Sequence, residues 1–151
     1  MMADTPSLGR FDGREHVLPA RVYYEDTDFT GVVYHASYLR FFERGRTEFL
    51  RAAGVEHSAL LALPEPCAFA VTHIAVAFRQ AARVDDALEI RTAYRAGKGV
   101  RIAATQRILR SGALIAEAEV ELVCIRLDGR PRRPPPELTQ RIAPFLAQAA
   151  P

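Results

Sequence analysis

The stretch of residues 36–54, ASYLRFFERGRTEFLRAAG, decides the fold of this chain. Its apolar and small residues recur at intervals of three and four, which is typical of a helix with one buried face. That face carries Tyr38, Phe42, Gly45, Phe49 and Ala52. The opposite face carries Arg40, Glu43, Arg44, Thr47 and Arg51. We therefore predict one long α-helix from about Ala36, which Gly54 ends.

Strand patterns lie on both sides of this helix. Residues 17–25 favour a strand that runs into a turn at Asp26. A shorter helix is predicted over residues 58–63, before two prolines, and the period then changes from helical spacing to two. Ala70, Thr72, Ile74, Val76 and Phe78 alternate there, so we expect them to share one face. Further strands are predicted over residues 87–96, 100–110 and 114–127.

The order of strand, long helix and four-stranded meander predicts an α+β fold. Its antiparallel sheet of about five strands would wrap around the single long helix. We expect a polar, loosely ordered leader over residues 1–16, one folded domain over 17–135 and a C-terminal helical tail over 136–151, interrupted at Pro144. One helix leaves a sheet face and the sheet edges uncovered, so a homo-oligomer is expected.

The composition argues against several classes of protein. The formal net charge is only +2, from 20 basic and 18 acidic residues, which does not favour a nucleic-acid-binding protein. Cys67 and Cys124 lack the spacing of a zinc site or a disulfide framework. No window resembles a signal peptide or a membrane span. We expect a cytoplasmic protein with no metal and no cofactor.

The segment before the long helix, residues 24–35 (YEDTDFTGVVYH), concentrates the residues suited to chemistry. It holds acidic residues, a glycine and a histidine next to a helix start. Backbone N–H groups at a helix start, and the positive end of the helix dipole, suit an oxygen that gains negative charge. Two interpretations remain open here: Asp26 and Asp28 are turn formers with His35 part of a cap, or a carboxylate acts in a reaction.

The sequence resembles a known family in this segment and beyond it. The matching stretches are VYYEDTD at 22–28, GVVYH at 31–35, Tyr38, FER at 42–44, RTE at 46–48, LEI at 88–90, TQR at 105–107, AEAE at 116–119 and VC at 123–124. They resemble the Tol-Pal-associated (YbgC-like) acyl-CoA thioesterases, hotdog-fold relatives of 4-hydroxybenzoyl-CoA thioesterase. The resemblance covers about residues 17–135.

The resemblance implies a hotdog fold, dimers that pair into tetramers, and the hydrolysis of acyl-CoA to a free acid and CoA. It assigns the catalytic carboxylate to Asp28 and the N–H that polarises the thioester carbonyl to His35. The side chains of Tyr34 and His35 would lie beside that carbonyl, where they can orient water or the acyl group. Phe29 and Thr30 depart from the family pattern, which has small residues before the glycine, and Gly45 replaces a common alanine.

The substrate should also meet Gly31 and Val33 of the loop, and its phosphates require basic side chains. Those available are Arg83, Lys98, Arg130, Arg132 and Arg133, but none sits in a phosphate-specific motif, and a solvated basic surface is the better explanation for any one of them. Asp28 can act as general base or as nucleophile. Acyl carrier protein as donor, and the length of the acyl group, stay open. The alternative functions are an acyl-CoA-binding protein without activity and a hotdog hydratase.

Overall fold

The computed structural model describes residues 4–6 and 9–147. Its six strands are β1 Arg10–Asp12, β2 Glu15–Arg21, β3 Ala68–Phe78, β4 Ala87–Ala96, β5 Arg101–Arg110 and β6 Ala113–Ile125. Its helices are α1 His35–Ala52, α2 His57–Leu61 and α3 Pro136–Ile142, with 3-10 turns η1 Tyr24–Asp26 and η2 Ala143–Phe145. None of these helices is both long and apolar enough to cross a membrane, as far as the described residues extend.

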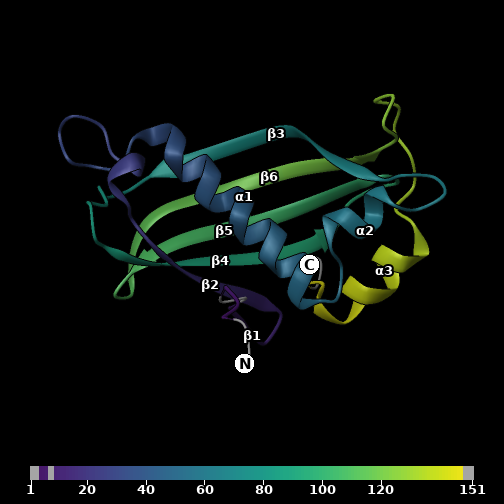
Figure 1. Ribbon diagram of the computed structural model, residues 1–151, viewed down its shortest axis with the longest axis horizontal. Helices are drawn as coiled ribbons and strands as arrows, with labels where there is room; N and C mark the ends of the chain where they lie inside the picture. Colours follow the sequence, from purple (N-terminus) through teal and green to yellow (C-terminus); the bar gives the residue numbers. More distant parts are fainter. Residues whose placement is uncertain (1–3, 7–8, 148–151) are drawn as a thin grey trace.

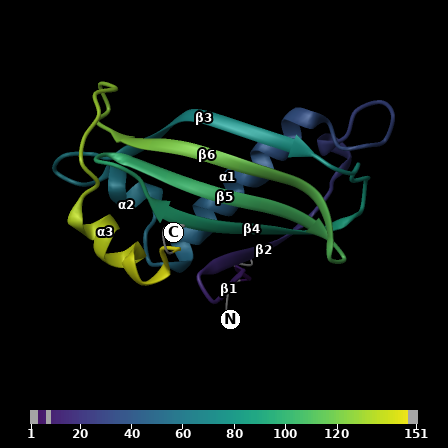
Figure 2. The ribbon, with the colours of Figure 1, turned by 180° about the vertical axis from the view of Figure 1, so that it is seen from behind.

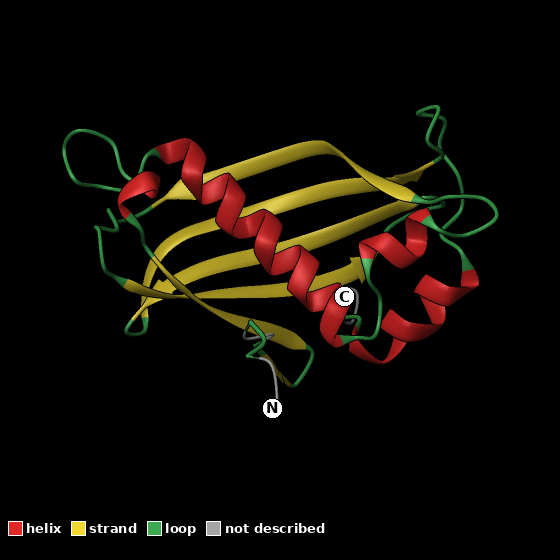
Figure 3. Cartoon of the chain, viewed as in Figure 1, coloured by secondary structure: helices red, strands yellow, loops and turns green. Residues whose placement is uncertain are grey.

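The strands form one antiparallel sheet in the order β1-β2-β4-β5-β6-β3. The long helix α1 lies diagonally across one face of this sheet (Figure 1), and no helix of the described residues lies on the other face (Figure 2). Figure 3 shows the two shorter helices together beside the C-terminal end of α1. The predicted α+β architecture, a sheet around one long helix, is therefore confirmed.

The sixth strand comes from the region expected to be a loose leader. The prediction was wrong for residues 10–16, because β1 pairs with β2 in a short hairpin. Phe11 of β1 stacks on Phe145 with ring centroids 4.0 Å apart and meets Phe49 edge-on at 5.1 Å. These ring contacts hold the hairpin on the end of the core. Residues 1–3 and 7–8 of the expected leader, and 148–151 of the expected tail, lie outside the described residues.

The alternation predicted along β3 is broken by a bulge. Val71 pairs with Leu122 and His73 pairs with Glu121, so Thr72 is an extra residue between two paired positions. An extra residue reverses the faces on its two sides. Ala70 and Thr72 therefore do not share a face with Ile74, and the prediction that they do was wrong.

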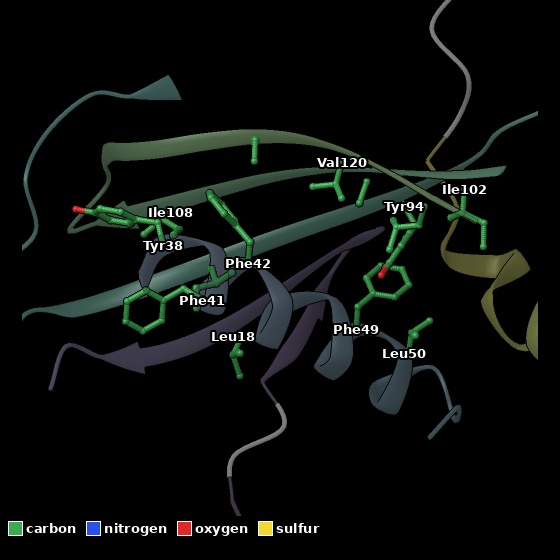
Figure 4. Close-up of a cluster of buried hydrophobic side chains, with 14 of the residues drawn as sticks. Leu18, Tyr38, Phe41, Phe42, Phe49, Leu50, Tyr94, Ile102, Ile108 and Val120 are labelled. Carbon is green, nitrogen blue, oxygen red and sulfur yellow. The ribbon is translucent and has the colours of Figure 1, made fainter. Parts of the chain in front are cut away.

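The core lies between α1 and the sheet. Phe41, Phe42 and Phe49 of α1 are at most 1% exposed, and Figure 4 shows them among apolar side chains of the strands. Rings of this size supply much of the free energy of burial. The helical periodicity predicted Tyr38, Phe42, Gly45 and Phe49 of the buried face, whereas Ala52 is only partly buried. It did not predict the burial of Ser37, Phe41, Leu50 or the charged Arg46.

Arg46 is part of a polar cluster at the helix–sheet contact. Its guanidinium donates to Gln106 Oε1 at 2.8 Å and also contacts Glu43. The Gln106 amide donates to the backbone oxygen of Phe42 and to Thr92 Oγ1, both at 2.8 Å. Hydrogen bonds between these groups offset the cost of removing them from water, which is large for an unpaired charge.

Gly45 lets α1 approach this cluster closely. A Cβ at this position would stand 2.6 Å from Ile90 Cγ2 and 2.8 Å from Thr92 Oγ1. Glycine in a helix interior costs about 1 kcal/mol relative to alanine. The close approach is the packing reason for accepting that cost.

We predict that Gly45→Ala lowers the free energy of unfolding despite the better helix propensity of alanine. Overpacking costs about 1–3 kcal/mol, which exceeds the gain in propensity of about 1 kcal/mol. Urea denaturation measures the difference, with Arg44→Ala on the exposed face of the same helix as the control. A Gly45→Ala protein more stable than wild type would contradict this account of the helix–sheet contact.

Candidate functional site

The acidic segment before α1 forms a tight hairpin. Thr27 and Val33 face each other as an isolated antiparallel bridge, and the Asp28 N–H donates to the Val32 oxygen at 2.9 Å. The Gly31 N–H donates to the Asp28 oxygen at 3.1 Å, and Gly31 has a φ of +83°. A turn followed by a residue with positive φ is typical of a three-residue hairpin loop, and glycine adopts that φ without strain. The loop projects from one end of the molecule (Figure 1).

Asp28 uses one carboxylate oxygen to shape this turn. Its Oδ1 accepts hydrogen bonds from the Thr30 hydroxyl at 2.5 Å and from the Thr30 N–H at 2.8 Å. The bond from the hydroxyl is the larger cause, and the two bonds together hold the pKa of the Asp28 carboxyl below its usual value. Asp28 is thus a turn former, as one interpretation of the sequence held. Its second oxygen, Oδ2, accepts no hydrogen bond from the described residues.

Asp26 has a different environment and a different task. It is buried, and its Oδ2 accepts the Tyr23 N–H at 2.8 Å, which closes the 3-10 turn η1. Its backbone oxygen accepts the Tyr34 N–H at 2.9 Å. Asp26 therefore fixes the base of the hairpin to the residue that precedes α1.

The start of α1 presents donors beside this base. His35 is the first helical residue, and no side chain in the described part of the chain caps the helix. The Ser37 N–H bonds to the Tyr34 oxygen at 2.8 Å, but no acceptor among the described residues binds the N–H of His35 or of Ala36. Unbonded N–H groups at a helix start favour a negatively charged oxygen.

The side chains of Tyr34 and His35 lie at the surface next to these donors. Tyr34 is 47% exposed, and its ring centroid is 4.5 Å from that of His35. An open hollow of about 280 Å³ adjoins His35. It is lined by Val33, His35, Tyr38, Phe78, Arg79, Gln80 and Ala81. Phe29, at the tip of the hairpin, has a fully exposed ring.

Comparisons with known proteins agree with this geometry. The model of the thioesterase-like superfamily matches residues 22–144. Over 108 residues the chain is 49% identical to the acyl-CoA thioester hydrolase YbgC of Escherichia coli O6:H1, which covers 71% of this chain and 79% of that protein. The chain belongs to the YbgC family of thioesterases. It is therefore a thioester hydrolase.

Other YbgC relatives and solved structures support the same assignment. The acyl-CoA thioesterase YbgC of Haemophilus influenzae is 44% identical over 110 residues, or 73% of this chain and 80% of that protein. The crystal structure of a probable thioesterase from Bartonella henselae matches with a TM-score of 0.78 at 43% identity, covering 80% of this chain and 99% of that one. The hotdog fold that the resemblance implied is confirmed.

In this YbgC-family chain, the segment between β3 and β4 holds the hairpin from the other side. The Val33 N–H donates to the Ala82 oxygen at 2.8 Å, and Val32 forms a bridge with Arg83. The Tyr38 hydroxyl accepts the Ala82 N–H at 3.1 Å. Asp86, which the sequence analysis did not single out, accepts hydrogen bonds from the Arg83 N–H at 2.8 Å and from Arg110 at 2.7 Å.

The structure separates the predicted basic residues. Arg83 lies beside the hairpin, through its bridge to Val32. Lys98 follows β4, and Arg130 and Arg132 follow β6, at the opposite end of the sheet. The ten residues of β4 span about 33 Å. Arg133 lies at that opposite end too, beside Ala96 and Arg101. The chain therefore brings Asp28, Gly31, Val33, Tyr34, His35 and Arg83 into one region, but not the other four basic residues.

The contact between Thr30 and Asp28 was missed in the sequence, where Thr30 stood only as a departure from the family pattern. A signal for it was present. An aspartate often accepts a hydrogen bond from the backbone two residues later, and a threonine at that position adds a hydroxyl donor.

Proposed function

We propose that this thioesterase hydrolyses acyl-CoA, with Asp28 as its reacting carboxylate and the N–H of His35 as the donor that polarises the thioester carbonyl. One observation carries the proposal. A partly exposed carboxylate with a free oxygen and a helix start with unbonded N–H groups stand on the two arms of one hairpin. The names of the YbgC relatives support acyl-CoA as the substrate.

A thioester needs these two groups more than it needs a strong acid. Its leaving group is a thiol with a pKa of about 8.5, so the sulfur departs as a thiolate with little help from a proton donor. What remains is to supply an attacking oxygen and to stabilise the negative charge that develops on the carbonyl oxygen. The free Oδ2 of Asp28 and the N–H groups at the start of α1 match these two requirements.

Asp28 acts in one of two ways. As a general base, its carboxylate takes a proton from a water molecule that attacks the carbonyl. As a nucleophile, it attacks the carbonyl itself and forms a mixed anhydride that water then opens. Both routes need the ionised carboxylate, and the hydrogen bonds from Thr30 favour that form.

The thioester donor and the acyl group are matters for assay. Acyl carrier protein is the second candidate donor, because it carries its acyl group through the same thioester bond, on an arm similar to that of CoA. A panel of short, long and aromatic acyl-CoAs and acyl carrier proteins, ranked by kcat/KM, identifies the substrate. Release of free thiol in the same assay separates hydrolysis from the two alternative functions, binding without turnover and hydration.

We predict that Asp28→Asn reduces kcat by at least about 10³-fold while folding and substrate binding persist. Asparagine retains the shape and an oxygen that can accept the Thr30 hydrogen bonds, but it is neither a base nor an effective nucleophile. Asp26→Asn is the matched control and should affect kcat less, because Asp26 is bonded to Tyr23. Wild-type kcat in purified Asp28→Asn would refute the assignment.

The backbone and the side chain of His35 make separable predictions. If its N–H polarises the carbonyl, His35→Ala keeps most of the activity, and His35→Pro loses about 10²-fold or more in kcat. His35 is the first helical residue, where proline is well tolerated, and Tyr34 already has the extended ψ of 135° that precedes a proline. Circular dichroism and thermal melts establish that both variants fold. Equal inactivity of His35→Ala and Asp28→Asn would instead indicate that the imidazole is required.

We also propose that the protein is a cytoplasmic homo-oligomer. The β3 edge of the sheet is 11 residues long, and no strand among the described residues pairs with its outer side. Val71 and Phe78 on this strand are 47% and 51% exposed. A long edge with exposed apolar residues favours pairing with a second chain. The buried thiols of Cys67 and Cys124 are free, which suits a reducing compartment.

Multi-angle light scattering on the purified chain should give a mass of two or four protomers at assay concentration. The physical reason is the burial of the β3 edge and its apolar residues. A strictly monomeric protein with full activity would rule out this part of the proposal.

A further inference from the structure

Thr30 places both of its donors on the same oxygen of Asp28. The hydroxyl is 2.5 Å and the N–H 2.8 Å from Oδ1. The hydroxyl distance lies at the short end of the range for an O–H bond to an ionised carboxylate. Two donors from one residue restrict rotation of the carboxylate, because any turn of the group lengthens at least one of the bonds.

We propose that Thr30 is the positioning residue for catalysis by Asp28: it holds Oδ1 and leaves Oδ2 as the oxygen that reacts. This inference rests on the proposed role of Asp28. The N–H bond belongs to the turn and is available to any residue at this position other than proline. The hydroxyl bond requires threonine or serine, so it is the bond to Asp28 that depends on the identity of residue 30.

The hydroxyl also favours the ionised carboxylate. Its bond is the largest cause of the lowered pKa of Asp28, and burial acts weakly in the opposite direction. The charged or titratable groups beside this loop include Glu25 and Asp26 of η1, Arg83 of the segment between β3 and β4, and Tyr34 and His35 at the start of α1. Behind Arg83, Asp86 and Arg110 form an ion pair. A substitution at Thr30 leaves all of these groups in place.

A lowered pKa alone would weaken Asp28 as a base, since catalytic bases work best with a pKa near the working pH. The benefit of the hydroxyl must therefore lie in geometry. A carboxylate that is already oriented does not lose rotational freedom in the transition state, and misplacement of a reacting group is expensive in rate. Loss of the hydroxyl should consequently lower kcat even though it makes Asp28 more basic.

The test compares Thr30→Val and Thr30→Ala, which lack the hydroxyl, with Thr30→Ser, which keeps it. Thr27→Val is the matched control, because the Thr27 hydroxyl is in the same loop but bonds to the Tyr24 oxygen at 2.7 Å. The measurements are kcat and KM from neutral pH down to the lowest pH at which the protein stays folded, and the titration of the Asp28 carboxyl by ¹³C NMR. The NMR titration runs from about pH 2 to about pH 8, a range that includes the usual carboxyl pKa of about 3.9 and lower values. The carboxyl signal is assigned by its absence in Asp28→Asn.

In Thr30→Val and Thr30→Ala we expect kcat to fall about tenfold, the effect of losing one hydrogen bond to a charged group, with KM little changed. The pKa of Asp28 rises without the hydroxyl bond, so activity should be lost at a higher pH on acidification than in wild type. Thr30→Ser should keep the wild-type kcat and the wild-type acid limb, which is the fall in activity on the acidic side of the pH profile. Thr27→Val should keep the wild-type acid limb.

The outcomes separate this inference from the proposed function. If Asp28→Asn is inactive while both hydroxyl-free variants keep the wild-type kcat, acid limb and NMR titration, Thr30 has no positioning role and the function stands. If Asp28→Asn is active, both proposals fail. If Thr30→Ser is as slow as Thr30→Val, the methyl group rather than the hydroxyl matters, and the inference is wrong.

Discussion

The close contact between α1 and the sheet is the constraint on which the rest of the structure depends. It requires that residue 45 have no side chain and that a buried guanidinium find acceptors. Gln106 on β5 accepts a hydrogen bond from the buried guanidinium of Arg46, and its amide donates to the helix backbone at the Phe42 oxygen. Apolar packing alone would let the helix slide or rotate on the sheet. The directional bonds from Arg46 and Gln106 select one placement of the helix.

The placement of α1 determines where its first turn lies, and so where the hairpin before it is attached. The hairpin is fastened on two sides, by the Asp26 oxygen at its base and by the Ala82 oxygen from the segment between β3 and β4. Tyr38 of α1 supports that segment through the Ala82 N–H. The position of the hairpin is thus set by the core, through one helix and one connecting segment, rather than by the hairpin alone.

Most of the elements predicted from the sequence were predicted from the regular spacing of apolar residues. The long helix and four of the strands were visible as regular spacing, the short helix α2 was predicted from the prolines that follow it, and the family motif marked the hairpin. What periodicity could not show were departures from regularity. The bulge at Thr72 leaves no mark in an alternating pattern, and the strand at Arg10–Asp12 is too short to have a period. Arg46 was hidden because its burial depends on an acceptor 60 residues away.

The exposed ring of Phe29 has a thermodynamic consequence. Because the ring lies in water, its apolar surface does not stabilise the fold. Its hydrophobic free energy would be gained only if a ligand or another chain covered the tip of the hairpin. Burial of that surface would release about 25 cal/mol per Å² and lower the heat capacity of the complex. A negative change in heat capacity on ligand binding would therefore be the calorimetric sign that the Phe29 ring has become covered.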